Sequence, residues 1–247
     1  MKKIIALFLA IAVMLSLVFV LSSCGGEDDK GSVSITSVEV VDGQLIVTYS
    51  DGTVKNLGNA VPEELGTDGL LYHLLPDGTY GVTAGAAHSL ETVIIPATHE
   101  GKAVTQIMES AFHGAKNIKN IVIPAGVTDI GKNAFAACIS LTSVTIPDSV
   151  TSIGDKAFSY CSSLTSIIIP DGITEISARA FYRCTGLTNV TIPVSVTSID
   201  LYAFCHCTGL INITYNGTAA QWNAIEKGLY WSDDTGYYTI TCTDYII

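Results

Sequence analysis

The apolar positions in the second half of the chain recur every 23 residues, while the polar positions between them vary. Phenylalanine marks the same place in five successive units, at Phe112, Phe135, Phe158, Phe181 and Phe204. Isoleucine, alanine and proline form further columns in the same register, which run through Ile107, Ala111, Pro124 and their equivalents. Self-similarity at such a period is typical of a solenoid, in which each repeat contacts only its neighbours.

The order of residues within one unit predicts a coil with two short strands and one turn. The alternating segment 144–146 is typical of a strand, and Pro147 ends it because proline cannot donate a ladder hydrogen bond. Residues 150–153 form a second extended segment, and residues 155–161 suit one helical or 3₁₀ turn. A single coil cannot bury its apolar side, so we expect a mainly β solenoid of stacked 23-residue coils with short helical turns.

The regions on either side of the repeats predict caps that close the ends of the stack. Pro76-Asp77-Gly78 is a turn signal between two apolar runs and predicts a β-hairpin ahead of the repeats. Behind them, residues 219–227 suggest an amphipathic helix that carries Trp222, and residues 237–241 predict a closing strand. The expected order is a signal peptide (1–23), a polar tether (24–32), a small β meander (33–57), a linker (58–69), a hairpin cap (70–87), the solenoid (88–215) and a C-terminal cap (216–247).

The repeat consensus, L-T-x-V-x-I-P-x-x-V-T-x-I-x-x-x-A-F-x-x-C, is clearest from Leu164 to Cys184. It resembles the BspA-like, or Treponema pallidum-type, leucine-rich repeat family of bacterial surface proteins. The resemblance covers roughly residues 88 to 215. It implies a leucine-rich repeat solenoid that binds a partner rather than an enzyme, and adhesion to host or neighbouring cells as a role.

The N-terminus has the pattern of an export signal. Lys2 and Lys3 precede an apolar run over residues 4–20, and Leu21-Ser22-Ser23-Cys24 resembles the lipobox of bacterial lipoproteins. The resemblance implies that Cys24 is the lipidation site and that the mature protein is extracytoplasmic, anchored to the cell membrane and exposed at the surface. The alternative is an uncleaved membrane helix, because the run approaches the length that spans a bilayer.

Charge and the spread of reactive side chains exclude several classes of function. The formal net charge of -11 disfavours a nucleic-acid partner, since binding a polyanion depends on lysine and arginine. The serines and threonines recur as repeat positions, the histidines are scattered, and no Gly-rich phosphate loop opens a helix. We therefore expect a monomeric protein that is not an enzyme and has no cofactor.

The cysteines follow the repeat rather than a disulfide or metal pattern. Four of them occupy one column, three residues after each phenylalanine, at Cys138, Cys161, Cys184 and Cys207, and Ala115 fills the same column in the first full repeat. A position that accepts alanine or cysteine is a small buried site. In Cys205-His206-Cys207 the first cysteine lies in an outward column, so the two thiols should point apart and we expect no metal site.

Variation concentrates around the phenylalanines, where basic and aromatic residues interrupt an otherwise acidic surface. The candidate binding patch comprises Lys156, Tyr160, Arg179, Tyr182, Arg183, Tyr202 and His206. Tyrosine and arginine often carry interface energy, so the patch would bind an extracellular protein or glycan. Two alternatives remain open: the patch could be an ordinary solvated face, and the protein could be a structural or accessory component of the cell envelope without a host partner.

Overall fold

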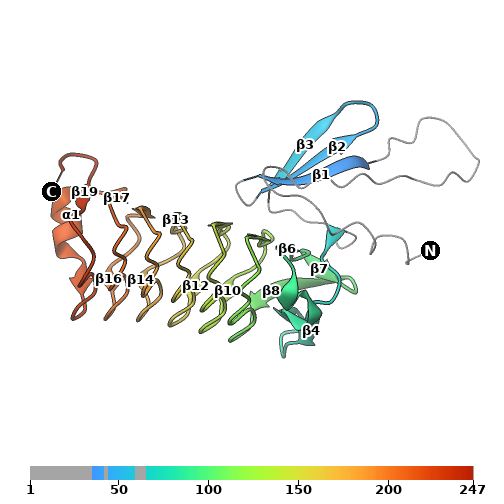
Figure 1. Ribbon diagram of the computed structural model, residues 1–247, viewed down its shortest axis with the longest axis horizontal. Helices are drawn as coiled ribbons and strands as arrows, with labels where there is room; N and C mark the ends of the chain where they lie inside the picture. The colour runs from blue at the N-terminus through green and yellow to red at the C-terminus, as the bar shows by residue number, and fades with distance from the viewer. Residues whose placement is uncertain (1–34, 42–43, 59–64, 247) are drawn as a thin grey trace, which may run out of the picture.

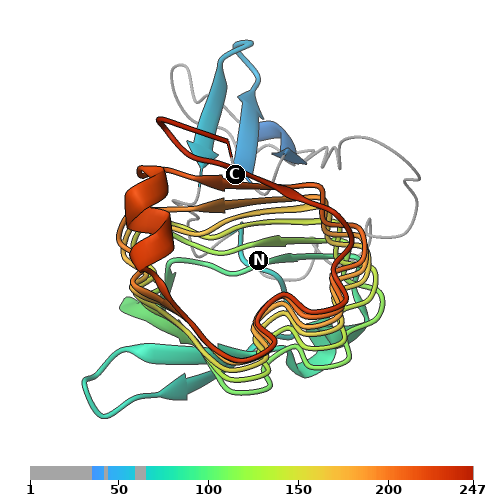
Figure 2. The same ribbon diagram turned by 90° about the vertical axis from the view of Figure 1, so that its left-hand side faces the viewer.

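The computed structural model describes residues 35–41, 44–58 and 65–246. The expected signal peptide, Cys24 and the polar tether lie outside these residues. Within the described part of the chain, no helix combines the length and the apolar character needed to cross a membrane. The repeats form a single stack of coils, which Figure 1 shows from the side and Figure 2 shows along the stack.

Each coil has three sides, and on two of them the short strands of successive coils pair in parallel, forming two consecutive sheets on each side. The first side is built from β6 (Thr92–Ile94), β9 (Asn120–Val122), β11 (Ser143–Thr145), β13 (Ser166–Ile168), β15 (Asn189–Ile192), β17 (Asn212–Tyr215) and β19 (Thr239–Thr241). The second side is built from β5 (Tyr80–Thr83), β8 (Lys102–Ile107), β10 (Asp129–Ile130), β12 (Ser152–Ile153), β14 (Glu175–Ile176), β16 (Ser198–Ile199) and β18 (Glu226–Lys227). Strand partners in the central coils are equivalent residues of successive repeats, such as Val144 and Ile121. The fold class expected from the spacing is therefore confirmed.

The third side differs from the helical turn that the sequence suggested. It is a run of tight turns, which we call the turn ladder, over residues 108–115, 131–138, 154–161, 177–184 and 200–207. Backbone N–H groups alternate between a bond inside the coil and a bond to the next coil. The Ala134 N–H donates to the Gly131 carbonyl (3.1 Å), whereas the Phe135 N–H donates to the Ala157 carbonyl of the following coil (2.8 Å). This alternation satisfies the backbone without a continuous helix.

The core is a column of stacked aromatic rings surrounded by aliphatic side chains. The five repeat phenylalanines are fully buried. Neighbouring ring centroids lie 5.3, 5.2, 5.6 and 5.2 Å apart along the column, with interplanar angles from 2° to 16°. The isoleucine column and the leucine column pack in the same core cluster. Each coil thus adds one ring to a continuous stack.

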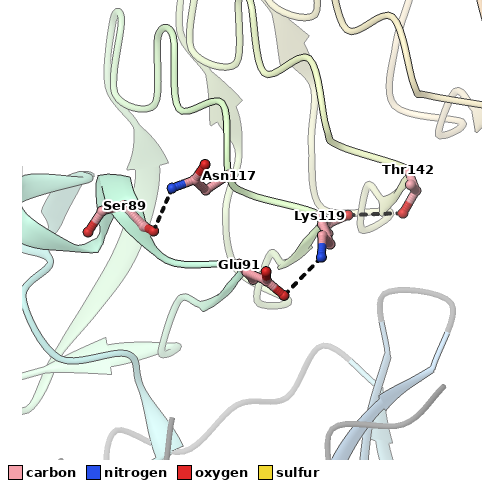
Figure 3. Close-up of polar contacts among 5 residues, drawn as sticks. All are labelled: Ser89, Glu91, Asn117, Lys119 and Thr142. Atoms are coloured by element: carbon pink, nitrogen blue, oxygen red, sulfur yellow. Dashed lines mark hydrogen bonds and ion pairs between the residues drawn. The ribbon is translucent and has the colours of Figure 1, made fainter. Parts of the chain in front are cut away.

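The threonines of the consensus join the coils at their corners. The Thr142 hydroxyl donates to the Lys119 carbonyl (3.1 Å), and the Thr188 hydroxyl donates to the Thr165 carbonyl (2.9 Å). Figure 3 shows this contact of Thr142 beside an ion pair between Lys119 and Glu91 (3.0 Å) that links the first two coils. A β-favouring side chain at this position therefore also satisfies a carbonyl of the preceding coil.

The N-terminal end is closed by a hairpin whose second strand already belongs to the solenoid. Strand β4 (Leu71–Leu74) pairs antiparallel with β5, and β5 pairs parallel with β8. The coil stack consequently begins before residue 88, which was the start expected from the sequence. The extra residues of the first repeat form a second hairpin between β7 (Thr98–His99) and β8. The C-terminal part of the expected linker is docked, since Thr67 exchanges hydrogen bonds with Ile94.

The C-terminal cap is a further coil with an inserted helix. Helix α1 (Ala219–Ala224) begins at a capping box in which Thr218 and Gln221 satisfy each other's backbone N–H groups. It is shorter than the expected 219–227 helix because β18 begins at Glu226 and pairs with β16. Trp231 then meets the last phenylalanine ring edge-to-face (6.3 Å, 86°), which closes the aromatic column.

The N-terminal meander is a three-stranded antiparallel sheet. It contains β1 (Ile35–Val41), β2 (Gln44–Tyr49) and β3 (Val54–Gly58) in the order β1-β2-β3. The turn between β2 and β3 is fixed by Asp51, whose carboxylate accepts a hydrogen bond from the Thr53 N–H (2.8 Å). This bond lowers the pKa of Asp51, and it is the ordinary role of aspartate in a turn.

Candidate functional site

Most residues of the candidate patch occupy two special rows of the turn ladder. The rows lie two residues before and two residues after each phenylalanine, and their residues have a positive φ. The first row runs through Ser110 (56°), Asn133 (54°), Lys156 (57°), Arg179 (56°) and Tyr202 (58°). The second row runs through Gly114 (73°), Ala137 (60°), Tyr160 (62°), Arg183 (59°) and His206 (60°). Six of the seven candidate residues therefore stand in the left-handed region, and Tyr182 lies between the rows.

The left-handed backbone is unfavourable for most of these residue types. In this region the Cβ of an L-residue lies too close to the following carbonyl oxygen, which costs about 1–2 kcal/mol. Glycine has no Cβ, and asparagine and aspartate tolerate the conformation better than other residues. The alternating hydrogen bonds of the turn ladder require the conformation in every coil. Gly114 and Asn133 suit it, whereas lysine, tyrosine and arginine do not.

Arg183 is the centre of a cluster that spans three coils. Its guanidinium lies over the Tyr160 ring (5.7 Å) and over the Tyr182 ring (5.5 Å). The Arg183 Nε also donates a hydrogen bond to the Tyr182 hydroxyl (3.2 Å), and this bond raises the pKa of Arg183 further. The two tyrosine rings meet edge-to-face at 5.6 Å, and Tyr182 meets His206 in the same way at 5.4 Å. Three successive repeats thus contribute to one cation–π group.

Arg179 heads a second group in the neighbouring row. Its guanidinium lies over the Tyr202 ring (4.8 Å), and Tyr202 stacks on Tyr230 (5.5 Å, 20°). Lys156 occupies the equivalent position one coil earlier and is half-buried. We call these seven candidate side chains the cation–aromatic cluster: Lys156, Tyr160, Arg179, Tyr182, Arg183, Tyr202 and His206.

The arginines of the cluster are held by rings rather than by carboxylates. Among the residues that the structure describes, none of Lys156, Arg179 and Arg183 forms an ion pair. The cluster's one ion pair in this part of the chain joins the His206 Nδ1 to an Asp234 carboxylate oxygen (3.2 Å). Arg179 and Arg183 are the two arginines of a chain whose net charge is -11.

Sequence reasoning missed two residues that continue the rows into the C-terminal cap. Tyr230 (φ 57°) follows Tyr202 in the first row, and Asp234 (φ 54°) follows His206 in the second. Backbone bonds from Tyr202 to Leu229 and from His206 to Asp233 fix this correspondence. The inserted helix shifts the spacing, so the 23-residue period could not reveal them.

The cysteine column lies in the core, as its spacing suggested. The thiols of Cys138, Cys161, Cys184 and Cys207 are buried and free, and each donates to the phenylalanine carbonyl of the preceding coil at 3.0–3.2 Å. Burial raises the pKa of Cys138 to about 12 and also raises the pKa of Cys161 and Cys184. Such thiols are protonated and poorly nucleophilic at neutral pH.

Cys205 corrects one expectation. Its column was assigned to the outer surface, but Cys205 is only 3% exposed. Ser159 and Ala136 of the same column are also buried, whereas Tyr182 is half-buried and His113 is exposed, so burial in this column varies from coil to coil. Within the described residues, no group of three histidine, cysteine or acidic side chains is arranged to hold a metal ion.

Comparisons with known proteins agree with the geometry. A family model described as "BspA type Leucine rich repeat region (6 copies)" matches residues 86–224. A leucine rich cell surface protein from Faecalibacterium prausnitzii A2-165 is 34% identical and has a TM-score of 0.59, with 65% of this chain and 41% of that protein covered. This chain thus spans less than half of that protein.

A second solved structure supports the fold alone. The Treponema pallidum leucine rich repeat protein is 23% identical and has a TM-score of 0.51, with 66% of this chain and 84% of that chain covered. No curated protein matches the sequence. The family model accounts for more than half of the chain and coincides with the coils seen in the structure, so the chain belongs to the BspA-type leucine-rich repeat family.

Proposed function

We propose that the protein is exported, is anchored to the cell membrane through a lipid on Cys24, and exposes its solenoid at the cell surface. There the cation–aromatic cluster binds an extracellular protein or glycan and contributes to adhesion to host or neighbouring cells. The family supports a binding role. The similar protein from Faecalibacterium prausnitzii is described as a cell surface protein, which supports the location.

One observation carries the binding proposal. The cluster places six large or charged side chains at backbone positions that glycine or asparagine would occupy at lower free energy. Strained residues of this kind persist where the surrounding structure fixes them, and they gather at functional sites. Their contacts in the structure are mostly with one another, at the surface of the turn ladder. We infer that these side chains are present, despite the strain, because they bind a ligand.

Substitution by glycine separates binding from folding. Tyr160→Gly and Arg183→Gly remove the central side chains and relieve the left-handed strain, so the coils should remain folded. A matched control, Ile168→Thr with Thr191→Ser, alters exposed or half-buried side chains on the first side of the stack. The full chain would be produced in a non-adherent bacterium and attachment to epithelial cells, matrix proteins and other bacteria would be counted.

We expect the wild type and the control to increase attachment and the glycine variant to lose that increase. Equal attachment by all three proteins would refute a binding role for the cluster. Co-purification with envelope proteins without any attachment would favour an accessory role in the envelope instead.

The lipid anchor has its own test. Cells that produce the full chain would be fed labelled palmitate and then fractionated. The wild type should carry the label and stay with the membrane, whereas Cys24→Ser should lose both properties. An unlabelled variant that stays with the membrane would point to an uncleaved membrane helix.

A further inference from the structure

We propose that the ligand of the cation–aromatic cluster is an acidic polysaccharide, recognised through carboxylate or sulfate groups on successive sugars. This inference rests on the proposed binding function and narrows it to one chemical class. Its starting point is the charge of the site, which is opposite to that of the rest of the chain.

The cluster presents cations that form no ion pair with any residue that the structure describes. Arg179 and Arg183 are the two arginines of the sequence, they lie in one coil, and Lys156 lies in the coil before them. Within the described chain none of the three is in an ion pair. Arginine presents a planar fork that binds carboxylate or sulfate oxygens through two parallel hydrogen bonds. The site therefore has unfilled capacity for anions.

Tyrosine rings hold the two arginines in place before a ligand arrives. Tyr202 supports the guanidinium of Arg179, while Tyr160 and Tyr182 support that of Arg183. An arginine that is already ordered loses less side-chain entropy on binding than a free one. Three nearby acidic residues form no ion pair with these cations among the described residues: Asp155 is exposed beside Lys156, Asp233 is exposed close to Cys205, and Asp234 is paired with His206.

The spacing of the coils distinguishes a polysaccharide from an acidic peptide. The strands of successive coils pair directly, which places the coils about 4.8 Å apart. Lys156 and Arg179 occupy the same row in successive coils. Alternate residues of an extended peptide, which share one face, are roughly 6.6 Å apart. The repeat of one pyranose unit along an extended polysaccharide is closer to the spacing between neighbouring coils. Successive acidic sugars can therefore lie opposite the cations of successive coils.

The tyrosines add the second element that sugar recognition uses. Tyr160 is 46% exposed and combines an aromatic ring with a hydroxyl group. Sugars offer apolar C–H faces and many hydroxyls, and tyrosine can meet both. Cations flanked by tyrosines thus suit an acidic sugar better than a bare cationic patch would.

The test measures binding of the full chain, solubilised from membranes in a mild detergent, to immobilised polymers of defined chemistry. The probes are polygalacturonate for carboxylates, dextran sulfate for sulfates, neutral dextran as a backbone control, and polyglutamate as an acidic peptide. We expect binding to one or both acidic polysaccharides, no binding to dextran, and binding to polyglutamate that is about tenfold or more weaker. The stronger of the two acidic polysaccharides identifies the anionic group.

Paired charge variants locate the site. Arg179→Gln with Arg183→Gln should weaken polysaccharide binding by about tenfold or more, because two charge-assisted hydrogen bonds are lost. The control, Lys116→Gln with Lys132→Gln, removes the same charge from exposed positions of earlier coils and should change binding less than about threefold. Arg179→Lys with Arg183→Lys keeps the charge but not the fork and should be intermediate.

Three results would overturn the inference: no binding to either acidic polysaccharide, equal binding to polyglutamate, or equal losses in the Arg→Gln and Lys→Gln pairs. The proposed function fails separately, when the glycine variant attaches to cells as well as the wild type. If attachment depends on Tyr160 and Arg183 but acidic polysaccharides do not bind, the function stands and the ligand class is wrong.

Discussion

Left-handed positions on the turn ladder allow the backbone strain to be measured without disturbing any other contact. A Cβ added at Gly114 meets nothing within 4 Å, so Gly114→Ala changes only the backbone energy of a residue at φ 73°. Alanine in this region costs about 1–2 kcal/mol, and the lower chain entropy of alanine returns about 0.5–1 kcal/mol. Gly114→Ala should therefore destabilise the protein by about 0.5–1 kcal/mol. Ala137→Gly, at the equivalent position one coil later, should stabilise it by a similar amount.

The assay is reversible urea or thermal unfolding of the full chain, followed by circular dichroism. For a protein of this size each kcal/mol shifts Tm by roughly 2–4 °C, so shifts of about 1–4 °C in opposite directions are expected. Ala178→Gly is the matched control, because the backbone of Ala178 is not left-handed. This variant should lose about 0.5–1 kcal/mol of unfolding free energy. If Gly114→Ala stabilises the protein by about 0.5–1 kcal/mol, as expected at an unstrained position, the left-handed rows carry no strain. The main argument for a functional cluster would then fail.

Three further predictions concern the core and the corners. Phe158→Ala should cost about 3–5 kcal/mol in unfolding free energy, because the ring is fully buried between Phe135 and Phe181; a neutral result in urea unfolding would contradict the stacked column. Thr188→Val should cost about 0.5–1.5 kcal/mol in the same assay through the lost corner hydrogen bond, and no loss would mean that water replaces it. The pKa of Cys138 is raised from 9.0 to about 12, so the unfolded chain releases this proton first and stability should fall as pH rises from about 9 to 12. Cys138→Ala should flatten that part of the pH profile of unfolding, and an unchanged profile would show that the thiol is not responsible.

The coil architecture was predictable because each core column keeps one kind of apolar residue, with few exceptions, at a constant spacing. Phenylalanine fills one site of every coil, and a shift of one residue would move every ring out of the stack. The cysteine column was assigned to the core for a similar reason, since alanine replaces cysteine in it. The seven residues of the candidate patch were found through their variation, and the structure brings six of them into ring or cation–π contacts.

The backbone of the turn ladder was not predictable from the same columns. Left-handed residues are normally signalled by glycine or asparagine, and here only Gly114 and Asn133 give that signal among ten row positions in the five repeats. Lysine, arginine and tyrosine in the other coils favour an ordinary turn. The closing coil was hidden for a different reason, because helix α1 interrupts the period. Local sequence thus failed where hydrogen bonds between coils impose the conformation.

The register of the strands has a consequence for how such a protein can change in length. Equivalent residues of successive central coils face each other, so an added block of 23 codons would create one complete coil wherever the duplication begins and ends. The new coil would present the same buried surfaces to both neighbours, and it would bring two new outward positions on the turn ladder. Gene duplication can therefore extend the array without redesigning its core, and selection can then act on each outward position separately.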